Sequence, residues 1–113
     1  FETVFVGTRE TCTPEGVKEI YHKANKRHKS LFGHLPSSPP ETYVILERPP
    51  DPMVDTNLHH GMSAIIGRIE EDRVFGNGIR LQVVSNNLQK GAARGMIQVA
   101  EFLFDQGYLQ RRV

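Results

Sequence analysis

The sequence has little of what marks a secreted or membrane-bound protein. Its single cysteine, Cys12, excludes an internal disulfide and fits a reducing compartment, so we predict a cytoplasmic protein. No apolar run approaches the roughly 20 residues that a membrane-spanning helix needs, and the first residues lack the basic start and apolar block of a signal peptide. The formal net charge of +1 gives no overall attraction to nucleic acid or to a membrane, and we predict neither as a partner.

The common nucleotide-binding motifs are also missing. Gly76-Asn77-Gly78 is a G-x-G, but it precedes an apolar segment instead of following a strand, and it has no third glycine, so we interpret it as a turn. There is no P-loop, no internal repeat and no low-complexity segment. Because the chain also lacks an initiator methionine, we expect it to be processed or to be part of something longer.

The first half of the 113 residues predicts a strand, a helix and a second strand. Thr3–Thr8 is β-branched and aromatic, as strands are. Thr13 is a good N-cap and Pro14 a good first helical residue, so a helix is predicted from Pro14 to about Lys29. The proline-rich connector that follows leads to a second strand, Thr42–Leu46, and to an irregular segment, Glu47–Leu58.

The second half predicts a β-hairpin and a long helix. In the third strand, Gly61–Ile69, strict alternation would place Met62, Ala64, Ile66 and Arg68 on one side and Ser63, Ile65, Gly67 and Ile69 on the other. The Asn77-Gly78 turn leads into a fourth strand, Ile79–Val84. A helix with a broad apolar face follows from about Gln89 to Asp105, with Gly107 as its C-cap. The predicted fold is one α+β domain over residues 1–113, with an antiparallel or mixed sheet covered by helices in the order β-α-β-β-β-α.

Three groups of reactive or charged residues have a simple structural interpretation. Cys12 precedes a helix N-terminus, which would favour a thiolate, but no base follows it, and we interpret it as a turn residue. His59 and His60 have no Cys, Asp or Glu at zinc-like spacing, so we predict no metal site. The basic residues of Lys23–Lys29 lie toward the end of the first helix, where cations complement the helix dipole, although an anionic partner remains an alternative.

The segment Ser85–Ala93, which joins the fourth strand to the last helix, is the most specific feature of the sequence. It contains two side-chain amides, Asn86 and Asn87, followed by Lys90-Gly91-Ala92-Ala93 at the start of a helix. One amide can cap the helix, and the other is then free to pair with a primary carboxamide, donor to acceptor and acceptor to donor.

This segment resembles that of the aspartate-semialdehyde dehydrogenases, commonly V-V-x-D-N-L-x-K-G-A-A in that family. Further similarity lies in Glu2–Val6, in Leu35–Pro39, in Gly61–Ile69 and in Phe75–Ile79, so that the resemblance spans nearly the whole chain.

The resemblance implies an NADP-dependent reduction of L-aspartyl-4-phosphate to aspartate semialdehyde, on the route to lysine, methionine and threonine. The family has a Rossmann domain and an α+β catalytic and dimerisation domain, whose last helix packs back on the Rossmann domain. By this resemblance the chain is the C-terminal part of a larger two-domain enzyme without its Rossmann part. A homodimer through the sheet and an acyl-phosphate substrate are implied partners.

The family's catalytic cysteine and histidine would both lie before Phe1, so we predict no catalytic residue in this chain and no activity of the chain alone. Cys12 matches neither position. Asn87 matches the position whose amide meets the nicotinamide carboxamide of NADP, and Asn86, which replaces the usual Asp, is the second predicted cofactor-binding residue. The same segment occurs in N-acetyl-γ-glutamyl-phosphate reductases, and a stand-alone interaction or dimerisation module is a further alternative.

Overall fold

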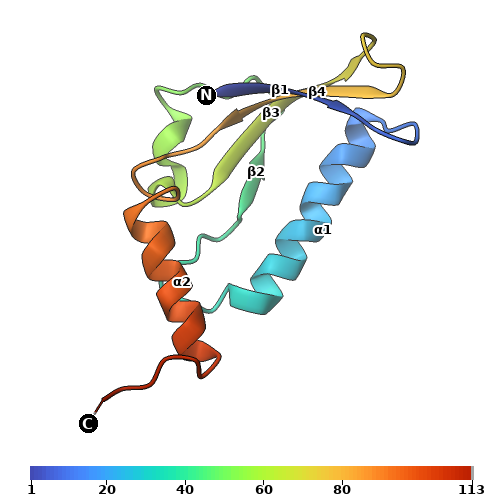
Figure 1. The fold of residues 1–113 in the computed structure, drawn as a ribbon. Coiled ribbons are helices and arrows are strands. Elements are labelled where there is room, and N and C mark those ends of the chain that lie inside the picture. Colours follow the sequence, from blue (N-terminus) through green and yellow to red (C-terminus); the bar gives the residue numbers. More distant parts are fainter. Residues whose placement is uncertain (113) are drawn as a thin grey trace.

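The computed structural model describes residues 1–112 as a small α+β domain with a four-stranded mixed sheet (Figure 1). In chain order, the elements are β1 (Glu2–Gly7), α1 (Pro14–Phe32), β2 (Tyr43–Ile45), the 3-10 segment η1 (Asp55–Gly61), β3 (Ala64–Asp72), β4 (Gly78–Val84) and α2 (Ala93–Asp105). The predicted α+β class and mixed sheet are confirmed. No helix within the described residues is long and apolar enough to cross a membrane.

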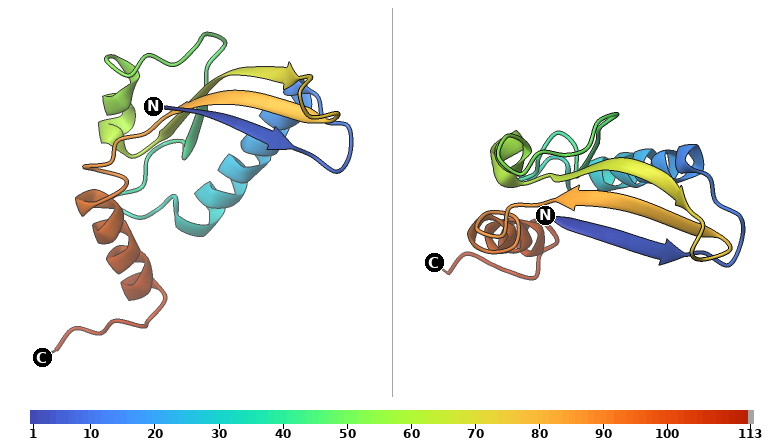
Figure 2. Two further views of the ribbon diagram at one scale, coloured as in Figure 1. Left: turned by 45° about the horizontal axis from the view of Figure 1, so that its top comes forward. Right: turned by 90° about the horizontal axis from the view of Figure 1, so that it is seen from above.

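The strands lie in the order β1-β4-β3-β2. β4 pairs antiparallel with β3, as the Asn77-Gly78 turn predicts, and also antiparallel with β1, while β2 pairs parallel with β3. A parallel pair needs a long connection. The connection from β2 to β3 contains the irregular segment that begins at Glu47 and the 3-10 segment η1, which lie on one side of the molecule (Figure 2).

Helix α1 covers one face of the sheet. Its N-cap is confirmed, because the Thr13 hydroxyl accepts a hydrogen bond of 3.1 Å from the Gly16 amide, but the helix runs three residues beyond the predicted Lys29, to Phe32. The core beneath it is built from Ile66, Ile79 and Leu81, against which Val17 and Tyr21 of the helix pack. The opposite face is covered less completely, since Thr3 and Phe5 toward the β1 edge are exposed.

The strict alternation predicted for the third strand is wrong beyond Gly67. Arg68 has a φ of 49°, and the pairing register with β4 shifts between Gly67 and Glu70. This β-bulge adds a residue to the strand, so Ile69 packs against the same core as Ile66 instead of lying on the opposite face. The predicted start of the strand is also wrong, because Gly61 ends η1 and β3 begins only at Ala64.

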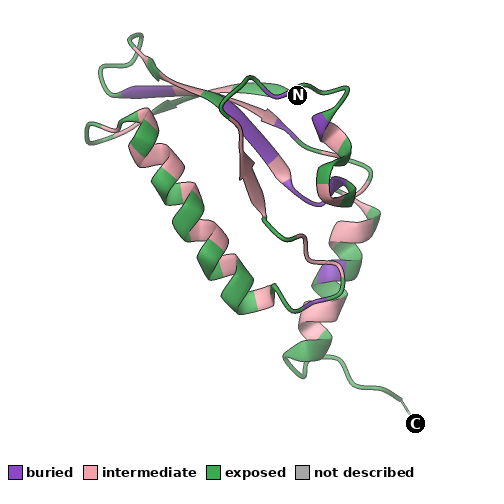
Figure 3. Cartoon of the chain, turned by 180° about the vertical axis from the view of Figure 1, so that it is seen from behind, coloured by how far each residue is buried: buried purple, intermediate pink, exposed green. Residues whose placement is uncertain are grey.

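Helix α2 stands apart from this core. Gln98 is its only buried residue, whereas the side chains of Met96, Ile97 and Phe104 are 74%, 52% and 62% exposed (Figure 3). The radius of gyration is 16.2 Å, against about 13 Å for a compact domain of this length. The predicted C-cap is wrong by one residue, because Gln106 is the C-cap and Gly107 follows it. Gly107 still ends the helix: its φ is 80°, and the amide of the next residue, Tyr108, bonds to the Leu103 carbonyl at 2.9 Å.

Candidate cofactor-facing junction

The segment Ser85–Ala92 leaves the sheet at the end of β4 and turns into α2. The helix begins at Ala93, so the predicted start at Gln89 is wrong by four residues. The physical reason is a compact turn: the Gly91 amide bonds to the Asn86 carbonyl at 3.2 Å, and the Ala92 amide bonds to the Gln89 carbonyl at 3.3 Å. Ala92 has non-helical angles, with φ −142° and ψ −111°.

Asn86 holds this turn together. Its Oδ1 accepts hydrogen bonds from the amides of Leu88 at 2.9 Å and Gln89 at 3.0 Å, and its Nδ2 donates to Oδ1 of Asn57 in η1 at 3.1 Å. The side chain thus ties the turn both to itself and to a segment 29 residues earlier. These bonds engage both polar atoms of the Asn86 side chain within the protein. The predicted cofactor-binding role of Asn86 stays a prediction.

Asn87, unlike Asn86, has a side chain that is free to bind a ligand. It is exposed, and its side-chain amide has no hydrogen-bond partner among residues 1–112. Gly91 lies close to its backbone, since a Cβ at Gly91 would be 3.1 Å from the Asn87 carbonyl oxygen. A free side-chain amide can offer one donor and one acceptor to a primary carboxamide.

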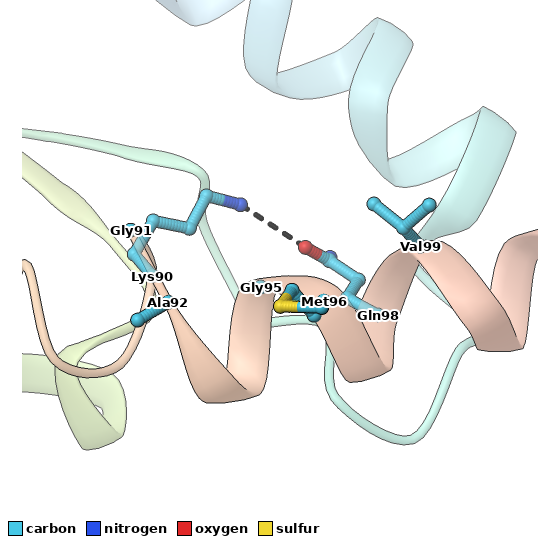
Figure 4. A pocket seen from close by; sticks show the side chains of 7 residues that line it. All are labelled: Lys90, Gly91, Ala92, Gly95, Met96, Gln98 and Val99. Atoms are coloured by element: carbon cyan, nitrogen blue, oxygen red, sulfur yellow. Dashed lines mark hydrogen bonds between the residues drawn. The ribbon is translucent and has the colours of Figure 1, made fainter.

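Beside the turn lies a hollow of about 420 Å³ at the start of α2 (Figure 4). Its wall contains two glycines and apolar side chains, with Lys90 as the one charged group; the lining residues are Lys90, Gly91, Ala92, Gly95, Met96, Gln98 and Val99. Lys90 Nζ donates to Gln98 Oε1 at 3.0 Å. Half-burial lowers the pKa of the Lys90 amine, because the ammonium ion is partly withdrawn from water.

Gly95 allows the turn to lie against the helix. A Cβ at this position would be 2.0 Å from the Lys90 carbonyl oxygen, a distance that no side chain could occupy without moving the backbone. Lys90 therefore lies close to α2 with its carbonyl, which only a glycine at position 95 allows, and is bonded to α2 by its ammonium on Gln98.

Of the other residues considered from the sequence, Cys12 and the basic residues of α1 lie away from the junction, whereas His59 and His60 line a hollow with Ser38 and Arg94 at the start of α2. Cys12 is half-buried against the core below α1, and its thiol donates weakly to the Thr13 carbonyl at 3.8 Å. His59 and His60 lie at the end of η1 with φ of 50° and 59°, and no group of three or more His, Cys, Asp or Glu side chains in residues 1–112 has the arrangement of a metal site. On α1, Lys23 pairs with Glu19 at 3.1 Å.

Sequence reasoning missed Gln98, Ser38 and Asn57, which hold the junction in place. Gln98 lies on the side of α2 opposite its apolar residues, yet it is only 8% exposed, and a buried polar side chain requires partners. No signal in the sequence indicated this burial, because a glutamine on the polar side of a helix is ordinarily solvent-exposed and its partner Ser38 lies 60 residues away.

No protein-family model matches the chain. Curated relatives include aspartate-semialdehyde dehydrogenases from three organisms. The chain is 31% identical over 105 residues to that of Methanothermobacter thermautotrophicus (90% of this chain, 29% of the relative). It is 31% identical over 117 residues to that of Aquifex aeolicus (94% of this chain, 29% of the relative). It is 36% identical over 101 residues to that of Cryptococcus neoformans (86% of this chain, 27% of the relative).

Solved structures agree in fold. Aspartate semialdehyde dehydrogenase II of Vibrio cholerae superimposes with a TM-score of 0.69 at 24% identity, covering 95% of this chain and 27% of that one, which shows the fold alone. The enzyme of Candida albicans, solved with NADP, gives a TM-score of 0.69 at 28% identity over 90% of this chain and 28% of that one. The chain thus spans less than a third of the length of the relatives that it matches.

Proposed function

We propose, because this chain is related to aspartate-semialdehyde dehydrogenases over about 90% of its length, that it is the C-terminal catalytic and dimerisation lobe of an NADP-dependent enzyme of this kind. The complete enzyme would reduce L-aspartyl-4-phosphate to aspartate semialdehyde and phosphate in the cytoplasm. The observation that carries the proposal is the Ser85–Ala92 turn, where the Asn86 side chain bonds within the turn and the exposed Asn87 side chain has no partner among residues 1–112. The lining of the hollow at the start of α2 begins at Lys90, three residues further along the chain.

The residues of the turn fit the nicotinamide end of NADPH, which supplies a hydride when bound. The Asn87 amide matches the donor and acceptor of the nicotinamide carboxamide. The neighbouring wall of Gly91, Gly95 and Met96 is apolar enough to receive a flat ring. The exposed Asn87 side chain bonds to no residue in 1–112, so its donor and acceptor are accessible to a ligand.

The exposed apolar side of α2 supports the proposal that another domain of the complete enzyme packs against it. Met96, Ile97, Val99 and Phe104 are each more than half exposed on one helix of 13 residues, and apolar patches of this kind mark interaction surfaces. We propose that the nucleotide-binding domain of the complete enzyme packs on this side. For the homodimer, the partly uncovered sheet face that carries Thr3 and Phe5 is the surface that we propose.

The experiment is an assay of the complete protein for NADP reduction by L-aspartate semialdehyde in the presence of phosphate. We expect turnover that depends on phosphate, no turnover by the 113-residue chain alone, and no reaction with N-acetyl-L-glutamate semialdehyde. Turnover of the acetylated substrate instead would assign the chain to the N-acetyl-γ-glutamyl-phosphate reductases. Activity of the isolated chain would refute the proposal that it is an incomplete lobe.

A second candidate function is an interaction module that binds an anionic partner through α1. The exposed side chains of Lys26, Arg27 and Lys29 have no ion-pair partner among residues 1–112, so this side of the helix carries uncompensated positive charge. Salt-sensitive binding to single-stranded nucleic acid, abolished by Lys26→Glu with Arg27→Glu, would favour this function over the first.

A further inference from the structure

Helix α2 is fixed to the rest of the domain by polar side chains and not by its apolar side. Glu101 accepts two hydrogen bonds from Ser37, from the amide at 2.9 Å and from the hydroxyl at 2.7 Å. Gln98 Nε2 donates to the Ser38 hydroxyl at 3.0 Å, and His34 contacts Asp105 at 3.0 Å. These contacts all reach the connector that follows α1, so they hold α2 in its orientation against that connector.

The hydrogen bonds around Gln98 have only one consistent direction. The Ser38 hydroxyl donates its proton to the Phe32 carbonyl at 2.5 Å and must therefore accept from Gln98 Nε2. This fixes the amide so that Gln98 Oε1 faces Lys90, whose ammonium can only donate. The result is a chain of donors that runs from Lys90 through Gln98 and Ser38 to the last turn of α1.

The Lys90 ammonium has an unusual environment for a lysine. It is half-buried, and no carboxylate of residues 1–112 lies within ion-pair distance of it. Withdrawing a charge from water without a counter-charge costs free energy, so stability alone gives no reason for a lysine here. What the lysine does provide is a second attachment of the turn to α2, in addition to the contact of its carbonyl with Gly95.

We propose that Lys90 is a positioning residue that acts through Gln98 to hold the turn carrying Asn87 in its binding orientation. The argument rests on the proposed function, because the binding partner of Asn87 is the nicotinamide carboxamide in that proposal. Gly91, the residue next to Lys90, packs directly on the Asn87 backbone, so a displacement of Lys90 is transmitted to Asn87. A methionine at position 90 would keep the apolar stem and remove the anchor.

The test compares Lys90→Met, Gln98→Met and the double variant in the complete protein, with Arg73→Met in the exposed turn between β3 and β4 as the matched control. Losing a charged hydrogen bond predicts that Lys90→Met raises the KM for NADP about 5- to 30-fold, with kcat changed less than about twofold. Because both residues act in one chain of bonds, the double variant should be no worse than the more impaired single variant. Unchanged KM in Lys90→Met, or effects of the two single variants that multiply, would overturn the proposal.

A second readout does not depend on enzymatic activity. The amides of Leu88 and Gln89, which bond to Asn86, should exchange with solvent deuterium at least fivefold faster in Lys90→Met than in the parent protein, while core amides of β3 and β4 keep their rates. If the complete protein proves inactive with NADP and this exchange still accelerates, the proposed function fails and the anchoring role of Lys90 stands. If exchange of Leu88 and Gln89 is unchanged, Lys90 does not hold the turn.

Discussion

Replacing Gly95 by alanine tests the shape of the junction most severely. In an exposed helix this substitution ordinarily stabilises by about 1 kcal/mol, because alanine restricts the unfolded chain and favours the helix. Here the new Cβ would lie 2.0 Å from the Lys90 carbonyl oxygen, so either the turn or the first turn of α2 must move. We expect a net loss of about 1 to 3 kcal/mol, the range for inserting a methyl group into a packed site.

The assay is urea unfolding of the protein, followed by far-ultraviolet circular dichroism. A loss of about 2 kcal/mol corresponds to a decrease in the midpoint of roughly 0.7 to 2 M urea. Since α2 contributes one buried residue, part of the loss should appear as local opening, seen as faster amide exchange in Met96–Val99.

Gly76→Ala is the matched control, because a Cβ at Gly76 meets no atom within 4 Å. This variant should be neutral or stabilised by up to about 1 kcal/mol. If Gly95→Ala were as stable as Gly76→Ala, with unchanged exchange in α2, the close contact between Lys90 and Gly95 would be refuted.

Three further substitutions test the fold around the junction. Ile66→Ala should lower the free energy of unfolding by about 2 to 5 kcal/mol, since Ile66 is 2% exposed in the core below α1; a loss below 1 kcal/mol in urea unfolding would contradict this core. Thr13→Ala should cost about 1 kcal/mol by the same assay, because it removes the bond to the Gly16 amide, and Thr13→Ser, which keeps the hydroxyl, is its control. The Arg48 guanidinium, and then the Asp51 amide, hold the pKa of Asp55 below its usual value. A carboxyl whose pKa is lowered on folding stabilises the folded state above its unfolded pKa, and this stabilisation is lost as the pH falls through the folded pKa. Asp55→Asn should therefore reduce the dependence of the unfolding midpoint on pH below about 4. An unchanged dependence would argue against the ion pair.

Local chemistry was sufficient to predict much of the fold. The Thr13-Pro14 start of α1, the Asn77-Gly78 turn and Gly107 at the end of α2 each depend on residues within a few positions of one another. The bulge at Arg68 could not be predicted, because a left-handed arginine is locally unfavourable and is stabilised only by the pairing of β3 with β4.

The junction was predicted in part for the same reason. The prediction that Asn86 or Asn87 caps the last helix is wrong, because the N-cap is Ala92 and no side chain bonds to the helix amides there. Asn86 instead stabilises the turn before the helix, through the amides of Leu88 and Gln89. The later start of α2 depends on how Asn86 bonds to Asn57 and how Lys90 lies against Gly95. The first of these contacts joins segments distant in sequence, and the second depends on the shape of a turn.

The most direct test of the central proposal, that Asn87 faces the nicotinamide, is the KM for NADP of Asn87→Ala in the complete protein. Removing an amide that both donates and accepts should raise this KM roughly tenfold, while the unfolding midpoint stays the same, because Asn87 is exposed and its side chain bonds to no residue in 1–112. A KM for NADP equal to that of the parent protein would contradict the account.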